Sequence, residues 1–209
     1  MKTQRIQFIF TQITASAVAV ALLCAANTTR AQDSKAAPAK KAPEVANALP
    51  AADKLELGLK GSWGGALEYR DYQSGNKFEL PMTAQIDIGK DNATISRVST
   101  FDDGPKTGLV YITTVSLFDK TASKVTNAVF RKGRAVDVST DDAKVSAYKD
   151  ATHWTIVYQQ NGTDNEKAAE IRVTQTLNGN ELVALKEVKP VGAADKDYLF
   201  RNQVRLIRK

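Results

Sequence analysis

Apolar and polar residues alternate with a period of two along most of the chain after residue 55. In the segment 82–88, for example, the even-numbered residues are Met, Ala, Ile and Ile, and the odd-numbered ones are Thr, Gln and Asp. The segments 154–158, 170–174 and 198–206 show the same alternation. Successive side chains on a β-strand point to opposite faces, so these runs predict strands with one buried and one solvated face.

The pattern predicts about ten strands joined by short turns, since adjacent short segments can merge into one. The Asn161-Gly162 and Asn178-Gly179 pairs predict tight hairpin turns, because both residue types accept a positive φ. The acidic pairs Asp102-Asp103 and Asp141-Asp142 are also expected at turns, where Asp bonds to local backbone amides. The expected strands cover residues 64–72, 78–89, 92–101, 108–118, 125–131, 134–140, 143–149, 153–160, 167–177, 181–188 and 198–207.

Strands connected in this way favour an all-β fold, an antiparallel up-and-down meander closed into a barrel. Closure removes the two unpaired edges that an open sheet of this length would expose. A two-sheet sandwich is the competing architecture, but sandwiches usually need long crossing connections and this chain has few. The one expected helical feature is a single turn near residues 53–59.

The first 53 residues differ from the rest in composition. Residues 1–31 have a basic start, an apolar stretch and small residues before Ala31, the layout of a secretory signal peptide. We expect cleavage after Ala31, with Ala26 as the alternative, and lipidation at Cys24 as a less favoured outcome. Residues 32–53 are rich in Ala, Lys and Pro and predict a flexible linker. The sequence therefore predicts a periplasmic or secreted β-barrel domain at 54–209.

Charge and composition exclude several classes of function. The formal net charge of +6 comes from 29 Lys and Arg against 23 Asp and Glu, and three of the positive charges lie in residues 1–31. A nucleic-acid-binding protein should instead concentrate basic residues in a stripe. A single Cys excludes a disulfide framework, and a single His argues against zinc sites built from several His ligands. We therefore expect no metal, no cofactor and no nucleic-acid partner.

The start of the β-domain resembles the Gly-x-Trp opening of lipocalins and related calycin barrels. Gly61-Ser62-Trp63 is followed directly by the first predicted strand. The resemblance implies that Trp63 closes one end of the barrel and that a basic side chain from near the last strand packs over it. Arg201, Arg205 and Arg208 lie near the C-terminus, and we assign barrel closure to Trp63 with Arg201 and Arg205.

A calycin-like barrel implies an interior that can hold a small molecule. Tyrosines on half-buried strands can line such a cavity with a few polar groups. Arg97 shares strand parity with Ile95 and Phe101, so an inward Arg97 would need an anionic ligand or a carboxylate partner. The predicted ligand-binding residues are Tyr69, Arg97, Tyr111 and Tyr158.

Two further features carry expectations about partners. Ten-stranded barrels that resemble this one can bind haem through a single His, but strand parity turns His153 outward, so we predict a surface or strand-end position for it. The predicted strand 108–118 is apolar on both faces. Its outer face needs a cover, which could be residues 55–59, the linker, or a second subunit in a homodimer. The alternative is a patch of exposed aliphatic side chains.

Three functions fit the sequence. The first is an exported lipocalin-like barrel that binds a small apolar ligand. No catalytic activity is inferred for it, because no residue set carries a catalytic role. The second is an envelope-associated interaction or inhibitor-like module with a packed interior. The third is an outer-membrane barrel. It is disfavoured because the charged residues on the polar strand faces would have to crowd a narrow lumen, and because the chain ends in Arg208-Lys209 without paired aromatic girdles.

Overall fold

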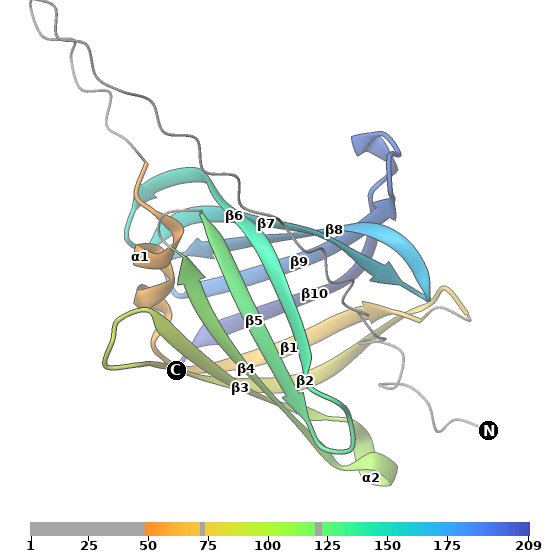
Figure 1. Cartoon of the computed structure of the whole chain (residues 1–209). Helices are drawn as coiled ribbons and strands as arrows, with labels where there is room; N and C mark the ends of the chain where they lie inside the picture. The colour runs from red at the N-terminus through yellow and green to blue at the C-terminus, as the bar shows by residue number, and fades with distance from the viewer. Residues whose placement is uncertain (1–48, 72–73, 120–122) are drawn as a thin grey trace, which may run out of the picture. The chain divides into compact units, whose positions relative to one another are not determined.

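The computed structural model describes residues 49–71, 74–119 and 123–209, so the predicted signal peptide and most of the predicted linker lie outside the described residues. Ten antiparallel strands follow one another around a closed barrel, in which β1 pairs with both β2 and β10 (Figure 1). This confirms the predicted all-β meander and barrel. The strands are β1 (Gly61–Arg70), β2 (Lys77–Ile88), β3 (Thr94–Asp102), β4 (Leu109–Asp119), β5 (Lys124–Arg131), β6 (Asp137–Asp150), β7 (His153–Asp164), β8 (Lys167–Asn178), β9 (Glu181–Pro190) and β10 (Leu199–Arg208).

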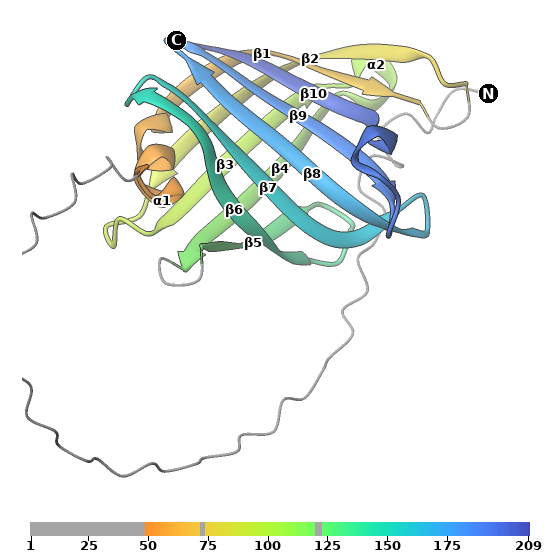
Figure 2. The same cartoon turned by 90° about the horizontal axis from the view of Figure 1, so that it is seen from above.

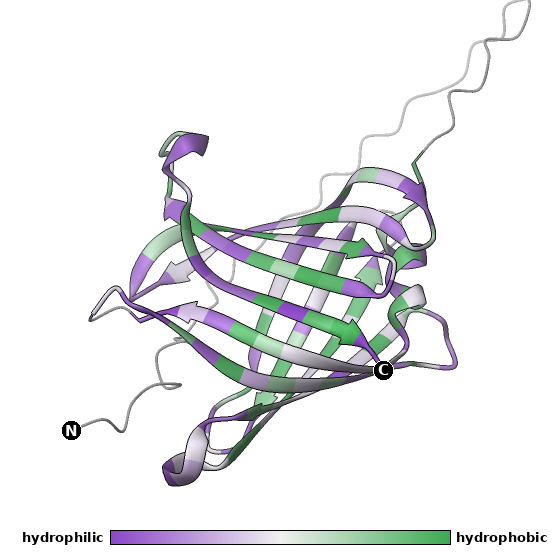
Figure 3. Cartoon of the chain, turned by 180° about the vertical axis from the view of Figure 1, so that it is seen from behind, coloured by the Kyte–Doolittle hydropathy of each residue, from purple (hydrophilic) through white to green (hydrophobic). Residues whose placement is uncertain are grey.

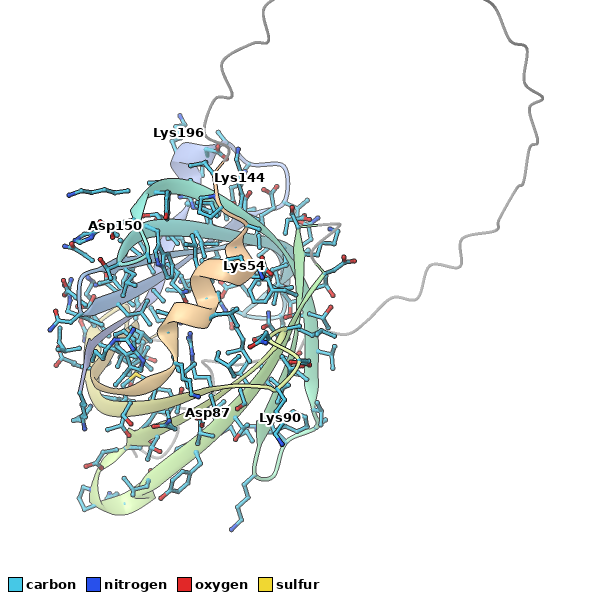
Figure 4. The ribbon with its side chains drawn as sticks, turned by 90° about the vertical axis from the view of Figure 1, so that its left-hand side faces the viewer. Lys54, Asp87, Lys90, Lys144, Asp150 and Lys196 are labelled. Atoms are coloured by element: carbon cyan, nitrogen blue, oxygen red, sulfur yellow. The ribbon has the colours of Figure 1, made fainter. Side chains whose placement is uncertain are left out.

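Short helical segments lie at the two ends of the barrel. The helix α1 (Ala52–Glu56) continues into the 3-10 turn η1 (Leu57–Leu59), as the sequence predicts for residues 53–59. Figures 1 and 2 both show α1 at the end where β1 begins, and Figure 4 views the barrel from that side, with Lys54 on α1. We call this the plugged end. At the opposite, far end, α2 (Gly104–Thr107) joins β3 to β4 and η2 (Asp195–Asp197) joins β9 to β10.

The most deeply buried side chains lie at the plugged end, within a core that also includes Tyr69 and Phe101 toward the far end. Leu55 and Leu59 are 6% and 0% exposed, because α1 and η1 lay their apolar side chains against the inner face of the barrel. Hydrophilic and hydrophobic residues alternate along the strands, as Figure 3 shows. The largest fully buried side chains are Leu59, Trp63, Ile86, Ile156, Leu182 and Leu206.

Two predicted turns are in fact continuous strand. The Asp141-Asp142 pair lies inside β6, which merges the predicted segments 134–140 and 143–149. Asp141 pairs with Val125 and Asp142 with Lys124 on β5, so a ladder of backbone hydrogen bonds replaces the local bonds that an Asp turn would make. Asn161-Gly162 lies inside β7, and the chain turns instead at Asn165 and Glu166, which both have positive φ.

The barrel closes where β1 meets β10. Seven residue pairs join the two strands, from Trp63 opposite Arg208 to Tyr69 opposite Asn202. The Arg208 guanidinium lies 4.3 Å from the centroid of the Trp63 ring and donates hydrogen bonds to the carbonyls of Lys60 and Gly58. The Trp63 indole N–H donates to the carbonyl of Leu59 at 2.9 Å. One arginine therefore connects the last strand to the first strand and to the segment formed by α1 and η1, which we call the plug.

The assignment of closure to Arg201 and Arg205 is wrong. Arg205 is exposed on the outer face of β10 and pairs with Glu181. Arg201 lies at the far end, at an irregularity in the β9–β10 register, and pairs with Asp164. The physical reason is register: Trp63 lies opposite Arg208, and a side chain three residues earlier on a twisted strand faces away from the indole.

Gly65 should be indispensable for this closure. A Cβ at Gly65 would lie 2.0 Å from the backbone oxygen of Arg205, whereas a Cβ at Gly64 meets the end of the flexible Lys209 side chain. We expect Gly65→Ala to lower the free energy of unfolding by about 2–3 kcal/mol, because backbone must move to accommodate it. Gly64→Ala is the matched control, with a change of about 0.5 kcal/mol. Urea unfolding followed by tryptophan fluorescence compares them, and equal midpoints would contradict the close approach.

Arg208 should contribute more than its neighbours on β10. Arg208→Ala removes the contact over Trp63 and two charge-assisted hydrogen bonds, so we expect a loss of about 2 kcal/mol in unfolding free energy. Arg205→Ala, which removes an exposed ion pair, should cost about 0.5 kcal/mol. Thermal unfolding monitored by circular dichroism measures both losses. An equal loss of stability in the two variants would argue against a special role of Arg208 in closing the barrel.

Candidate functional site

The inner face of the barrel carries charged residues as well as apolar ones. Arg97 pairs with Ile86, which is fully buried, so both side chains face inward. Lys186 pairs with Val173, and Val173 pairs with Tyr158, which places these three on the inner face too. We group the following inward polar side chains as the interior polar cluster. Its members are Arg97, Ser116, Asn127, Asp141, Tyr158, Asp164, Gln175, Lys186 and Arg201, with Glu56 from α1.

At the plugged end this cluster is centred on Glu56. Glu56 is 5% exposed, and its Oε1 accepts a hydrogen bond of 2.7 Å from the Tyr158 hydroxyl. The same oxygen accepts a hydrogen bond from the Gln175 amide, which is 4% exposed. Arg97 lies close enough to Tyr158 for its charge to act on the Tyr158 pKa. A carboxylate from the plug is therefore held by donors on β7 and β8.

A chain of hydrogen bonds continues along β4, β5 and β6. The Ser116 hydroxyl donates to Asn127 Oδ1 at 2.6 Å, and the Asn127 amide donates to Asp141 Oδ2 at 2.7 Å. Asp141 is 7% exposed. These bonds compensate part of the cost of placing a carboxylate inside the barrel.

Toward the far end lie two cationic side chains in different situations. The Arg201 guanidinium is bonded to Asp164, with Nε 2.7 Å from Oδ2. Lys186, by contrast, makes no hydrogen bond and no ion pair with any residue that the structure describes, although the charges of Asp164, Asp141 and Asp137 act on it. Arg97 likewise makes neither kind of contact within the described residues. The inner face thus presents two cations without a direct protein partner among those residues.

Burial shifts the pKa values of three of these groups. It lowers the pKa of Lys186, raises the pKa of the Asp141 carboxyl and raises the pKa of Tyr158. In each case the largest cause is desolvation, which disfavours the charged form. The hydrogen bond from Asn127 opposes the shift of Asp141, and the carboxylate of Glu56 adds to that of Tyr158.

Three of the four predicted ligand-binding residues face the interior. Tyr69 is 3% exposed and its ring lies 5.7 Å from that of Phe78, while Arg97 and Tyr158 belong to the interior polar cluster. Tyr111 is 57% exposed on the outer face of β4, so it cannot line the interior. The prediction for Tyr111 is wrong because it rests on residue type, whereas parity with inward Val110 and Ile112 places residue 111 on the other face.

Sequence reasoning misses Glu56, Asp141 and Lys186. Strand parity is a sufficient signal for Lys186, which follows Leu182 and Ala184 on the inward positions of β9. Asp141 is predicted to lie at a turn, so the face of a strand that its side chain would occupy is not considered. Glu56 carries no signal, because only the placement of α1 across the barrel end turns its side chain inward.

A cavity of about 600 Å³ lies beside α1. Its wall combines the segment that leads into α1, the ends of β4 and β6, and part of β7. The adjacent β5–β6 ladder has six pairs and ends at Lys124 and Asp142, whereas β6 continues to Asp150. The cavity therefore lies next to the end of the β5–β6 ladder, between α1 and β6. Residues that line it include Pro50, Asp53, Phe118, Ala143 and Val145.

His153 pairs with Asp150 at the turn between β6 and β7. His153 lies at the start of β7, as predicted, and its Nδ1 is 2.9 Å from Asp150 Oδ1 across the β6–β7 turn. Hydrogen bonds from Thr152 and His153 hold the pKa of the Asp150 carboxyl well below its usual range.

In residues 49–71, 74–119 and 123–209 no group of His, Cys, Asp and Glu side chains could hold a metal ion. No helix in the same ranges has the length and apolar composition needed to cross a bilayer.

The outer face of β3 to β6 exposes apolar side chains. α1 and η1 lie across the plugged end and do not cover this face, and residues 32–48 of the linker lie outside the described part of the chain. Leu109, Tyr111 and Leu117 on β4 are all more than half exposed. Further exposed apolar side chains on the same face are Val98 on β3, Phe130 on β5 and Val138 on β6. We call this set the outer apolar patch.

Comparison with known proteins supports the fold alone. No family model and no curated protein matches the chain. The crystal structure of Rv2717c from M. tuberculosis is similar, with a TM-score of 0.52 and 15% sequence identity over 77% of this chain and 98% of that one. A protein of unknown function from the DUF3598 family of Nostoc punctiforme matches over 77% of this chain and 100% of its own, with 10% identity and a TM-score of 0.21. The closed ten-stranded barrel is consistent with a calycin-like barrel.

The raised pKa of Asp141 should appear in the pH dependence of stability. Its folded-state pKa lies above the ordinary value of 3.8, so the stability it contributes is present below 3.8 and is lost as pH rises through the raised value. The wild type minus Asp141→Asn difference in unfolding free energy should therefore fall as pH rises across that window. Urea unfolding at a series of pH values measures it, with Asp87→Asn on the exposed face of β2 as control. A pH-independent difference would contradict the shift.

Proposed function

We propose that the protein is an exported, non-catalytic, lipocalin-like barrel that binds a small molecule in its interior. The observation that carries the proposal is the pair of inward cations, Arg97 and Lys186, which have no hydrogen-bond or ion-pair partner among the described residues. A buried charge without a partner is costly. If the core were purely structural, apolar side chains in place of the two cations would fill it at a lower cost. Export rests on the pattern of residues 1–31.

The chemistry of the interior refines the class of ligand. The sequence predicts a small apolar ligand, and the inner face does offer the half-buried apolar side chains Val129, Val173 and Val204. These lie on the same face as Arg97, Lys186 and the Tyr158 hydroxyl. A few polar groups in a mostly apolar pocket fix the orientation of a ligand. The proposed ligand therefore has an apolar body and at least one polar group.

Native mass spectrometry of the mature protein purified from its own host tests this function. We expect the wild type to retain a small molecule, because an enclosed site releases its ligand slowly. Lys186→Met should reduce the retained fraction about tenfold, since the ligand loses a charge-assisted contact. Lys90→Met, at an exposed turn, is the matched control and should retain the ligand as the wild type does. A wild type that shows only the mass of the bare chain would contradict the proposal.

A second candidate is an interaction module, and the outer apolar patch favours it. Leu109, Tyr111 and Leu117 are exposed on the same face of one strand, which is unusual for a surface with no partner. A homodimer through this face of β4 is the proposed arrangement. Two results would favour this candidate over the first. The wild type would show only the mass of the chain without a ligand, and it would form a dimer that the Tyr111→Lys variant does not form.

A further inference from the structure

Glu56 holds a position that a ligand could also use. Its side chain reaches from α1 into the barrel, and one carboxylate oxygen accepts hydrogen bonds from both Tyr158 and Gln175. Both donors belong to the barrel wall, on β7 and β8. Arg97 on β3 adds a positive charge near Tyr158 and makes no ion pair of its own within the described residues. The wall thus presents two donors and a cation that suit a carboxylate.

The donors and the acceptor differ in how firmly they are held. Tyr158 and Gln175 lie inside the β7–β8 ladder, which has twelve residue pairs. Glu56 is the last residue of a helix of five residues that has no side-chain bond at its N-cap. Helices this short gain almost all of their stability from packing. The receptor for the carboxylate is therefore preformed, whereas the carboxylate that fills it comes from the more adjustable element.

Resting on the interior binding proposed above, we propose that Tyr158, Gln175 and Arg97 form the seat for a carboxylate of the ligand, and that Glu56 competes with the ligand for this seat. The ligand class is then a small monocarboxylate with an apolar body. Val129, Val173 and Val204 on the inner face provide apolar surface for that body.

Competition follows from charge and from space. Two carboxylates cannot accept from the same donors at hydrogen-bond distance without strong repulsion, so the ligand must displace the Glu56 side chain. The cavity of about 600 Å³ beside α1 includes Ala52 and Asp53 of that helix in its wall, so there is free volume next to the element that has to adjust. The wild type therefore binds a carboxylate more weakly than its wall residues would allow.

The test uses a fluorescent carboxylate, 11-(dansylamino)undecanoic acid, and its methyl ester, which lacks the negative charge. Each is titrated into the mature protein after removal of bound small molecules. Glu56→Gln has nearly the same shape and no charge, so we expect it to bind the acid about tenfold more tightly than the wild type does. Affinity for the ester should change less than twofold. Glu79→Gln, on the exposed face of β2, is the matched control and should behave as the wild type.

Two further variants test the seat itself. In the Glu56→Gln background, Tyr158→Phe should weaken binding of the acid about tenfold and binding of the ester much less, because the hydroxyl donates a stronger hydrogen bond to a charged carboxylate than to an ester carbonyl. Circular dichroism checks that each variant is folded. If Glu56→Gln does not fold, Glu56→Asp replaces it, because its carboxylate is one methylene shorter and is expected to lose the contact with Tyr158.

The outcomes separate the two proposals. Tighter binding of the acid alone supports the carboxylate seat. Equal affinities in wild type, Glu56→Gln and Glu79→Gln overturn it and leave interior binding intact. An equal gain for acid and ester also overturns it, since α1 would then act only as a steric plug. If neither probe binds to any variant, interior binding itself fails, and the seat with it.

Discussion

The contact between Trp63 and Arg208 is the interaction on which the rest of the structure depends. A ten-stranded meander has two free edges until β1 pairs with β10, and this contact lies at the end of that ladder. The same guanidinium bonds to the carbonyls of Gly58 and Lys60, and the Trp63 indole bonds to Leu59. The same two side chains therefore take part both in closing the barrel and in holding α1 and η1 across its end, and α1 in turn places Glu56 inside.

Closure also explains why the interior can hold charge. In an open sheet the inward faces of β3, β7 and β9 would be wet, and Arg97, Tyr158 and Lys186 would be ordinary surface residues. Once the sheet closes, the same side chains face one another across a desolvated space, which lowers the pKa of Lys186 and raises that of Asp141. Charges in such a space cost free energy unless they are paired, and this cost is the physical basis of the binding proposal.

Strand parity makes most of the barrel predictable, and local turn chemistry causes the errors. Alternation alone puts Arg97 and Tyr158 on the same face as their apolar neighbours, and in the barrel that face turns inward. The Asp141-Asp142 and Asn161-Gly162 pairs are good turn formers in isolation, yet both are absorbed into long strands because neighbouring strands supply a complete hydrogen-bond ladder. The prediction for Tyr111 follows residue type against parity, and the side chain lies outside.

The sequence by itself determined that the chain from 54 onward is a β meander, how its strands alternate, and that Trp63 opens the domain. These properties depend on residues close in the chain, whose side chains must point to opposite faces of a strand. Only the tertiary structure decided that Arg208 meets Trp63, and that Glu56 lies against Tyr158 and Gln175. Both contacts join residues more than 100 positions apart, and they depend on the register of the closed barrel and on the angle at which α1 crosses its end, neither of which a local pattern encodes.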